Sequence, residues 1–256
     1  KISYVFFVAT MFYRSTDFKT VAVTTAMAAA HVLVLVLSRD LGNGLIFFLT
    51  YLFMLFVATS RAVYLGAGLG AGAAASVLAW QLFPHVQRRV EAWLDPWSDV
   101  ADTGYQIAQS LFAVGTGGWM GMGLDQGLPE KIPVVEKDFM ISAISEELGG
   151  LFAICLILIC LGCFLQFMMI AVRMQAMFYK LIAFGLGCEY IIQVLLTVGG
   201  AVKFIPLTGM TLPLVSYGGS SIAGTFILFS VIQGLYILKR NEEEEDEEEW
   251  SESKGK

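Results

Sequence analysis

The chain has 256 residues, of which 57% are hydrophobic and only 15% are charged. A soluble domain of this length needs more charge to cover its surface, so the composition excludes an ordinary soluble protein and indicates a polytopic membrane protein. The formal net charge of −6 comes from residues 242–249, which hold eight acidic side chains; the remainder carries 16 basic against 14 acidic ones, or +2, and we expect no nucleic-acid partner.

Six apolar windows are long enough to cross a membrane. A helix needs roughly 20 apolar residues to span the hydrocarbon core, and the windows that provide them are 20–37, 42–60, 62–83, 148–172, 181–201 and 222–238. Only the fifth window contains a charged residue, Glu189, and all six prolines fall outside the windows. Because proline interrupts helix hydrogen bonding, this distribution supports an all-α protein with about six transmembrane helices.

The two ends of the chain differ in character. Lys1 is followed directly by an apolar run, so we expect an N-terminally incomplete protein in which residues 2–13 finish an earlier helix. At the other end, a block of like charges repels itself and stays solvated. The sequence therefore predicts a membrane domain over residues 1–240 and an acidic, disordered tail over residues 241–256.

The distribution of Lys and Arg in short loops predicts the orientation. One side of the membrane would hold two such residues, Arg39 and Lys203. The other side would hold seven: Arg14, Lys19, Arg61, Arg173, Lys180, Lys239 and Arg240. Cytoplasmic loops carry the excess of positive charge. We therefore expect the tail to be cytoplasmic and the loops 84–147 and 202–221 to be extracytoplasmic.

Asp40 is the first candidate functional residue along the chain. It lies beside Arg39 in the short segment "SRDLGNG" between two predicted spans. Two such side chains at a membrane surface are often only directed toward water. Alternatively, the pair could hold a pyrophosphate or a divalent ion, because Asp supplies the oxygen ligands that hard cations prefer.

The large loop 84–147 contains apolar and aromatic segments rather than a hydrophilic linker. Its tryptophans suit the bilayer interface, and residues 105–114 are predicted to form a short helix lying on the membrane. The run "GTGGWMGMG" follows no strand and precedes no Walker lysine, so a tight surface turn is favoured over a phosphate-binding loop.

The end of this loop, "PVVEKDFMISAISEELGG", gathers carboxylates ahead of the fourth span. If residues 138–150 are helical, then Asp138, Ser142, Ser145 and Glu146 share one face. Asp is also a favoured N-cap residue, and the local pattern alone favours a helix cap over a catalytic group.

A second polar loop, "PLTGMTLPLVSYGGSS" at 206–221, offers several hydroxyls and two adjacent glycines. Irregular backbone of this kind is tolerated near a membrane where it lines a cavity, and a plain connecting turn is the alternative. The residues alone therefore fit an enzyme acting on lipid-linked substrates, a transporter or a structural scaffold.

The order of these motifs resembles the SEDS family (FtsW, RodA and SpoVE). The segments that carry the resemblance lie in family order and at family spacing: "RDLGNG" (39–44), "RRVEAWLDPWSD" (88–99), "GYQIAQSLFAVGTGGWMGMGL" (104–124), "DFMISAISEELG" (138–149) and "TGMTLPLVSYGGSS" (208–221). The family has about ten membrane helices, so the resemblance implies that roughly four precede this chain.

The resemblance implies a peptidoglycan glycosyltransferase that polymerises lipid II outside the cytoplasmic membrane, together with a class B penicillin-binding transpeptidase. A lipid II flippase and a non-catalytic scaffold are the alternatives. Asp138 matches the family's catalytic aspartate, and Asp40 matches an aspartate that would help to hold Mg²⁺ or Mn²⁺. The residues expected to contact substrate or pyrophosphate are Arg88, Arg89, Gln109, Ser216, Ser220 and Lys1.

Two features depart from the family pattern. Glu136 and Lys137 precede Asp138, where the family commonly has His-Thr or His-Asn. A neighbouring cation lowers the pKa of a carboxyl group and a neighbouring anion raises it, so this pair is expected to tune the base. Lys1 matches the lysine of a family "AK" pair whose upstream glutamate lies outside this sequence.

Overall fold

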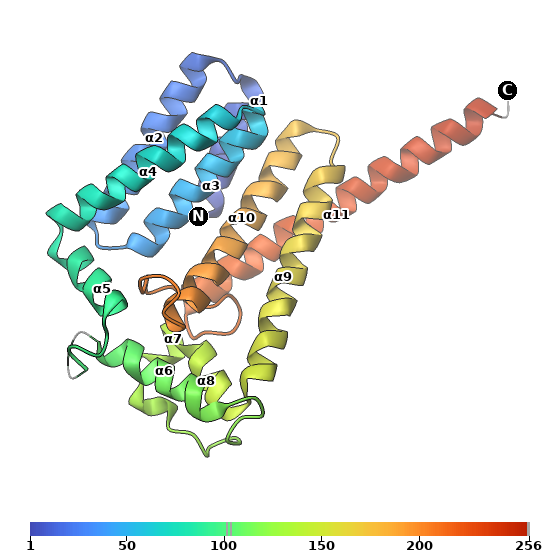
Figure 1. Cartoon of the computed structure of the whole chain (residues 1–256). Coiled ribbons are helices and arrows are strands. Elements are labelled where there is room, and N and C mark those ends of the chain that lie inside the picture. The colour runs from blue at the N-terminus through green and yellow to red at the C-terminus, as the bar shows by residue number, and fades with distance from the viewer. Residues whose placement is uncertain (101, 103, 255–256) are drawn as a thin grey trace.

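The computed structural model describes residues 1–100, 102 and 104–254, and in this part of the chain every regular element is a helix (Figure 1). Its elements in chain order are α1 (Ile2–Arg14), α2 (Phe18–Leu37), α3 (Leu41–Thr59), α4 (Ala62–Leu82), α5 (Pro84–Leu94), α6 (Tyr105–Gly117), η1 (Pro129–Lys131), α7 (Val135–Asp138), α8 (Met140–Glu147), α9 (Gly150–Arg173), α10 (Met177–Ala201) and α11 (Gly219–Lys254).

Six of these helices are long and apolar enough to cross a membrane, which confirms the predicted fold class. They are α2, α3, α4, α9, α10 and the part of α11 from Gly219 to Glu244. Short connections join α2 to α3, α3 to α4 and α9 to α10, and in Figure 1 consecutive spans run in opposite directions. A chain that alternates in this way places its connections on two opposite faces.

The face that carries the small helices is called here the loop face. It consists of residues 38–40, 83–100, 102, 104–149 and 202–218, and Figure 1 shows α5 to α8 gathered there. The opposite face holds the connections 15–17, 60–61 and 174–176. The site residues that the sequence predicts all belong to the loop face, apart from Lys1 and Ser220, which lie in other segments.

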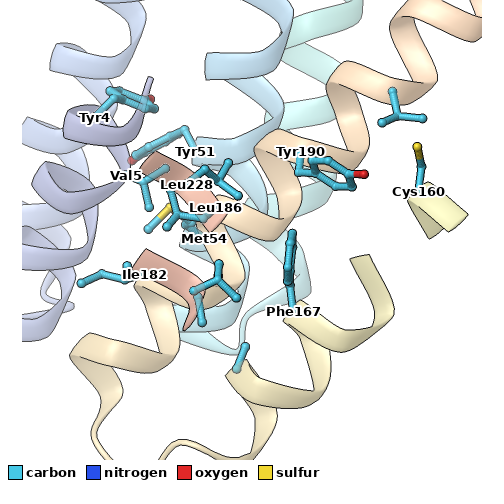
Figure 2. Packing of buried hydrophobic residues seen from close by; sticks show 14 of the residues in the cluster. Tyr4, Val5, Tyr51, Met54, Cys160, Phe167, Ile182, Leu186, Tyr190 and Leu228 are labelled. Atoms are coloured by element: carbon cyan, nitrogen blue, oxygen red, sulfur yellow. The ribbon is translucent and has the colours of Figure 1, made fainter. Parts of the chain in front are cut away.

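The core is built around α10, which packs against α9, α3 and α1. Of its span, 78% is buried inside the protein. Gly185 makes the close packing possible, because a Cβ atom there would lie 2.7 Å from both Met54 Sδ and Val5 Cγ1. Figure 2 shows the side chains of Val5, Met54 and Leu186 meeting in this cluster.

The outermost span, α4, shows the opposite pattern. It buries none of its residues within the protein and packs mainly on α3 and α5. A helix that is apolar all round and uncovered by protein suits contact with lipid.

The last helix continues past residue 240 to Lys254, whereas the sequence predicts a disordered tail from residue 241. Lys239 pairs with Glu243 at 2.8 Å and Arg240 pairs with Glu244 at 3.0 Å. Pairs at this spacing favour helix, which accounts for the continuation across the domain boundary at residue 240. That boundary stays a prediction.

Candidate active site

A cavity of about 250 Å³ opens on the loop face between α5, α6, the end of α7 and the loop after α10. We call it the first cavity. Its polar side chains are Arg88, Arg89, Gln106 and Asp138, and its walls include Leu207 and Gly209. The structure therefore brings together three residues that the sequence predicts as functional and that come from two distant segments.

Asp138 is the last residue of α7, where a break in the helix positions its carboxylate. The break falls at Phe139, which has φ −118° and a side chain that is only 1% exposed. Burial of this ring anchors the junction in the core, so α8 starts afresh at Met140. Phe139 occupies the N-cap position of α8 without a side-chain cap, and the interpretation of Asp138 as a helix cap is wrong.

The break also separates the carboxylates that a continuous helix would align. Asp138 lines the first cavity, Ser142 is fully buried against α6, and Glu146 lines a different cavity. The expectation of one polar face over residues 138–146 is therefore wrong, because α7 and α8 are separate helices.

The environment of Asp138 suits a proton acceptor. Partial burial raises the pKa of its carboxyl group above the usual value, Lys137 and Arg89 oppose the shift, and Glu136 adds to it. A carboxylate becomes a better general base as its pKa moves toward the working pH.

Arg89 joins the first cavity to the loop after α10. Its Nη1 donates to the carbonyl oxygen of Leu207 at 3.1 Å. Burial lowers the pKa of the guanidinium, while Asp138 and Asp40 raise it. An arginine stays protonated in proteins, so Arg89 brings a half-buried positive charge to the cavity, with Arg88 beside it on the same wall.

Further hydrogen bonds fix the elements around the cavity. Trp93 Nε1 donates to the carbonyl of Lys203 at 3.1 Å, and Lys203 Nζ donates to the carbonyl of Leu94 at 3.4 Å. The backbone N–H of Tyr217 donates to the carbonyl of Glu136 at 2.7 Å. These contacts hold α5 and α7 against the loop 202–218, so the irregular loop forms one wall of the site.

Gly209 brings the backbone of this loop close to the candidate base. Its φ of +75° lies in the left-handed region that favours glycine, and a Cβ atom would lie 3.6 Å from Asp138 Oδ2. A side chain at this position would strain the backbone and narrow the space beside the carboxylate.

Asp40 lies outside the first cavity and has a structural role. It is the N-cap of α3, and its Oδ1 and Oδ2 accept from the backbone N–H and side-chain amide of Asn43 at 3.1 and 2.7 Å. Among the residues whose side chains the structure describes, 1–100, 102 and 104–244, no three His, Cys, Asp or Glu side chains gather as a metal site would need. Both carboxylate oxygens of Asp40 are occupied by Asn43, and a metal role for Asp40 stays a prediction.

The remaining predicted site residues are dispersed. Gln109 lines another cavity, and Ser216 is buried with its Oγ accepting from the N–H of Leu212 at 2.9 Å. Ser220 is exposed at the start of α11. Lys1 Nζ donates to Gln193 Oε1 at 2.9 Å and thereby ties the start of α1 to α10. None of these four lines the first cavity.

Sequence reasoning missed Gln106 and Gly209 as site residues. Both lie inside segments that carry the family resemblance, and Gln106 precedes Gln109 by three positions, which places the two amides on neighbouring parts of one helix surface. The sequence could therefore have predicted Gln106 from its position relative to Gln109. It could not have predicted Gly209, because the approach of Gly209 to Asp138 depends on the fold.

The six spans define a multi-pass membrane protein, and the polar first cavity lies on its loop face. The chain belongs to the FtsW/RodA/SpoVE family of cell cycle proteins, whose profile it matches over residues 1–241. This confirms the family that the motif order predicts.

The relatives include the peptidoglycan glycosyltransferase RodA of Mycobacterium tuberculosis (strain ATCC 25618 / H37Rv), which is 39% identical over 199 residues, or 78% of this chain and 42% of that protein. A probable peptidoglycan glycosyltransferase FtsW of Aliivibrio salmonicida is 37% identical over 210 residues, 79% of this chain and 51% of the relative. The chain thus spans about half the length of these curated relatives.

A solved structure shares the fold. It is described as "Structural coordination of polymerization and crosslinking by a peptidoglycan synthase complex", and one of its chains superposes with a TM-score of 0.74 at 24% identity. The match covers 91% of this chain and 66% of that one. At this identity the likeness supports the arrangement of helices alone.

Proposed function

We propose that this chain carries the active site of a peptidoglycan glycosyltransferase that polymerises lipid II at the outer face of the cytoplasmic membrane. The observation that carries the proposal is the half-buried carboxylate of Asp138 in a cavity that also holds Arg88 and Arg89. The names of the RodA and FtsW relatives support the same reaction.

In the proposed mechanism, Asp138 acts as the general base. It removes the proton of the 4-hydroxyl of the acceptor GlcNAc as that oxygen attacks the anomeric carbon of the donor MurNAc. The new glycosidic C–O bond forms while the bond from the anomeric carbon to the pyrophosphate breaks, and undecaprenyl pyrophosphate leaves with the electron pair. Arg88 and Arg89 stabilise the negative charge of the leaving pyrophosphate, because guanidinium groups form strong charge-assisted hydrogen bonds to phosphate.

We further propose that any Mg²⁺ or Mn²⁺ used by the enzyme binds chiefly to the substrate's pyrophosphate. The supporting observations are that both carboxylate oxygens of Asp40 accept hydrogen bonds from Asn43 and that Asp138 lies near a cation, Arg89. A divalent ion would neutralise phosphate charge. The roles proposed for Asp138, Arg88 and Arg89 do not depend on it.

The orientation and the partner are also proposals. In the short connections alone, seven Lys and Arg lie toward the opposite face and two toward the loop face, and this excess supports a cytoplasmic α11 end and an extracytoplasmic loop face. A class B penicillin-binding transpeptidase is the proposed partner. The matched structure supports this choice, because it is a synthase complex described as coordinating polymerization with crosslinking.

The test is polymerisation of purified lipid II by the full-length protein, co-purified with its transpeptidase in the presence of Mg²⁺ and followed as glycan strands on a gel. We expect strands from the wild type and a loss of at least 100-fold in Asp138→Asn, since a positioned general base contributes about 10²–10⁴-fold. Asp125→Asn, which changes an exposed aspartate of the same loop, is the matched control and should retain activity.

Other results would favour the two rivals. Strands formed at the wild-type rate by Asp138→Asn would remove this residue from the mechanism. Translocation of lipid II without polymerisation by wild type and variant would favour the flippase, and neither activity from an intact complex with the transpeptidase would favour the scaffold.

A further inference from the structure

A second cavity of about 230 Å³ lies on the loop face between α6, α8 and the segment 128–132. Its polar side chains are Gln109, Thr116, Lys131 and Glu146, and Phe112 and Leu128 contribute apolar surface. Nothing in the proposed mechanism uses these groups. The cavity is several times larger than the roughly 30 Å³ that one water molecule occupies, so it can admit a side-chain-sized group.

Glu146 is the unusual group in the second cavity. Its side chain is only 7% exposed, and its Oε2 is buried without a hydrogen-bond partner. Its Oε1 receives one long hydrogen bond, from Thr116 Oγ1 at 3.4 Å. A buried carboxylate that lacks a partner is costly, so the protein alone leaves Glu146 incompletely satisfied.

The walls around Glu146 are closely fitted. A Cβ atom on Gly127 would lie 3.0 Å from Glu146 Cδ and 3.1 Å from its Oε2, so the absence of a side chain at residue 127 leaves room for the carboxylate. Lys131 lines the same cavity, yet among the residues with described side chains it forms no ion pair with Glu146. The site therefore offers a negative and a positive side chain that are not paired with each other.

These groups indicate the chemistry of the ligand. A single carboxylate beside a lysine is a poor site for a divalent ion, which needs several oxygen ligands. An ammonium group fits better, because it supplies three N–H donors and the positive charge that the buried carboxylate lacks. The apolar walls can contact the methylene groups that carry such an ammonium. Lys131 can bind a carboxylate or carbonyl group of the same ligand.

We propose that the second cavity binds the side-chain amine of the lipid II stem peptide, with the Glu146 carboxylate as its ion-pair partner. This inference rests on the proposed function and assigns a further part of the same substrate. Gln106 of the first cavity and Gln109 of the second lie three residues apart on α6, about 4.5 Å along the helix axis. One substrate molecule can therefore contact both cavities.

The test compares two forms of lipid II in the same polymerisation assay with the full-length complex. One form carries lysine in its stem peptide, and the other is identical except that the lysine ε-amine is acetylated. Acetylation removes the positive charge, so we expect KM to rise roughly tenfold or more, the factor that corresponds to loss of a charge-assisted hydrogen bond. We expect kcat to change little, since the amine is remote from the reacting atoms.

Two variants assign the effect to Glu146. In Glu146→Gln, KM for the free-amine substrate should rise to the value for the acetylated substrate, so that the discrimination disappears. Glu147→Gln alters the adjacent, half-buried carboxylate, which does not line the second cavity, and should discriminate like the wild type. Thermal unfolding of each variant identifies any general loss of folding. If a variant fails to fold, the comparison of the two substrates in the wild type still tests the inference.

The outcomes are distinct. Polymerisation with equal KM for both substrates would overturn the inference and leave the proposed function standing. Discrimination that persists in Glu146→Gln would overturn the assignment to this carboxylate. Failure of the wild type to polymerise free-amine lipid II would overturn the proposed function and the inference together.

Discussion

Asp138 and Glu146 show how two carboxylates eight residues apart acquire different properties. Asp138 is half-buried at the end of a short helix and lies near the guanidinium of Arg89, which limits the rise of its pKa. Glu146 is almost fully buried and accepts one long hydrogen bond from a threonine hydroxyl. The first arrangement suits proton transfer, and the second suits binding of a cationic group.

The charges next to Asp138 predict how the pH profile responds to substitution. Lys137 lowers the pKa of Asp138, so Lys137→Gln should raise it. A base with a raised pKa becomes protonated at higher pH, and the acid limb of kcat/KM should move upward by roughly 0.2 to 0.7 pH unit, the size expected of an exposed charge pair. The measurement is the initial rate of lipid II polymerisation across the acidic to mildly alkaline range.

Glu136→Gln provides the control of opposite sign. Glu136 raises the pKa of Asp138, so its removal should move the same limb downward, while the hydrogen bond from Tyr217 to its backbone carbonyl is retained. Shifts of both variants in one direction, or no shift in either, would contradict the assignment of the limb to Asp138.

The sequence grouped Asp138, Arg88 and Arg89, which line one cavity, but it did not predict the local structure around them. Asp138, Arg88 and Arg89 came from motifs, because the resemblance specifies which residues share a site. The local pattern around Asp138 instead favoured a helix cap, because the break at Phe139 arises from burial of a ring in the assembled core. Propensity cannot report such a tertiary contact. The structural roles of Asp40 and Ser216 were not foreseen either, although their hydrogen bonds reach only three and four residues along the chain.

At the scale of elements, a buried pair of hydroxyls joins α6 to the rest of the bundle. Ser110 Oγ donates to the carbonyl of Ala201 at 2.7 Å and lies 2.6 Å from Ser142 Oγ. A hydroxyl has one proton, so Ser142 must be the donor to Ser110. This relay fixes α6 against α8 and the end of α10, and thereby fixes the wall that both cavities share.

Packing of α6 on α8 yields a prediction with an internal control. A Cβ atom on Gly117 would overlap the carbonyl oxygen of Ser145 and lie 2.6 Å from Glu146 Cα, whereas one on Gly115 would meet nothing within 4 Å. Gly117→Ala should therefore destabilise the protein by about 1–3 kcal/mol, as overpacking does. Gly115→Ala should be neutral or slightly stabilising, because alanine favours helix over glycine.

The measurement is the thermal unfolding midpoint of each variant in the same detergent. Gly117→Ala should also reduce polymerisation, because it displaces α8 next to both cavities. Equal midpoints for the two variants would show that α6 and α8 do not pack as closely as the structure has them.

Elements were predictable to different extents. The sequence identified all six spans, including α10, from length alone, because a membrane-spanning helix needs about 20 apolar residues without interruption. The break between α7 and α8 and the continuation of α11 past residue 240 were not found. The first depends on tertiary burial, and the second depends on ion pairs between basic and acidic side chains one turn apart.

At the scale of the whole molecule, alternation of the spans gathers both cavities on one face. Both cavities, Asp138 and the glycine-rich turns belong to the loop face. Arg14, Arg61 and Arg173 end or follow helices at the opposite face. The positive-inside rule favours the exterior for the loop face, in agreement with the orientation proposed for the glycosyltransferase.

This orientation can be tested with a pair of exposed aspartates. In a background in which the four free cysteines are replaced by alanine, Asp125→Cys places a thiol on the loop face and Asp17→Cys places one in the connection between α1 and α2. Asp17 makes no side-chain cap bond, so its replacement should cost little stability. A membrane-impermeant maleimide added to intact spheroplasts should label the Asp125→Cys protein at once and the Asp17→Cys protein only after permeabilisation. The reverse pattern would place Asp138 in the cytoplasm, where lipid II that has already been exported could not reach it. That result would contradict both the orientation and the reaction proposed for the first cavity.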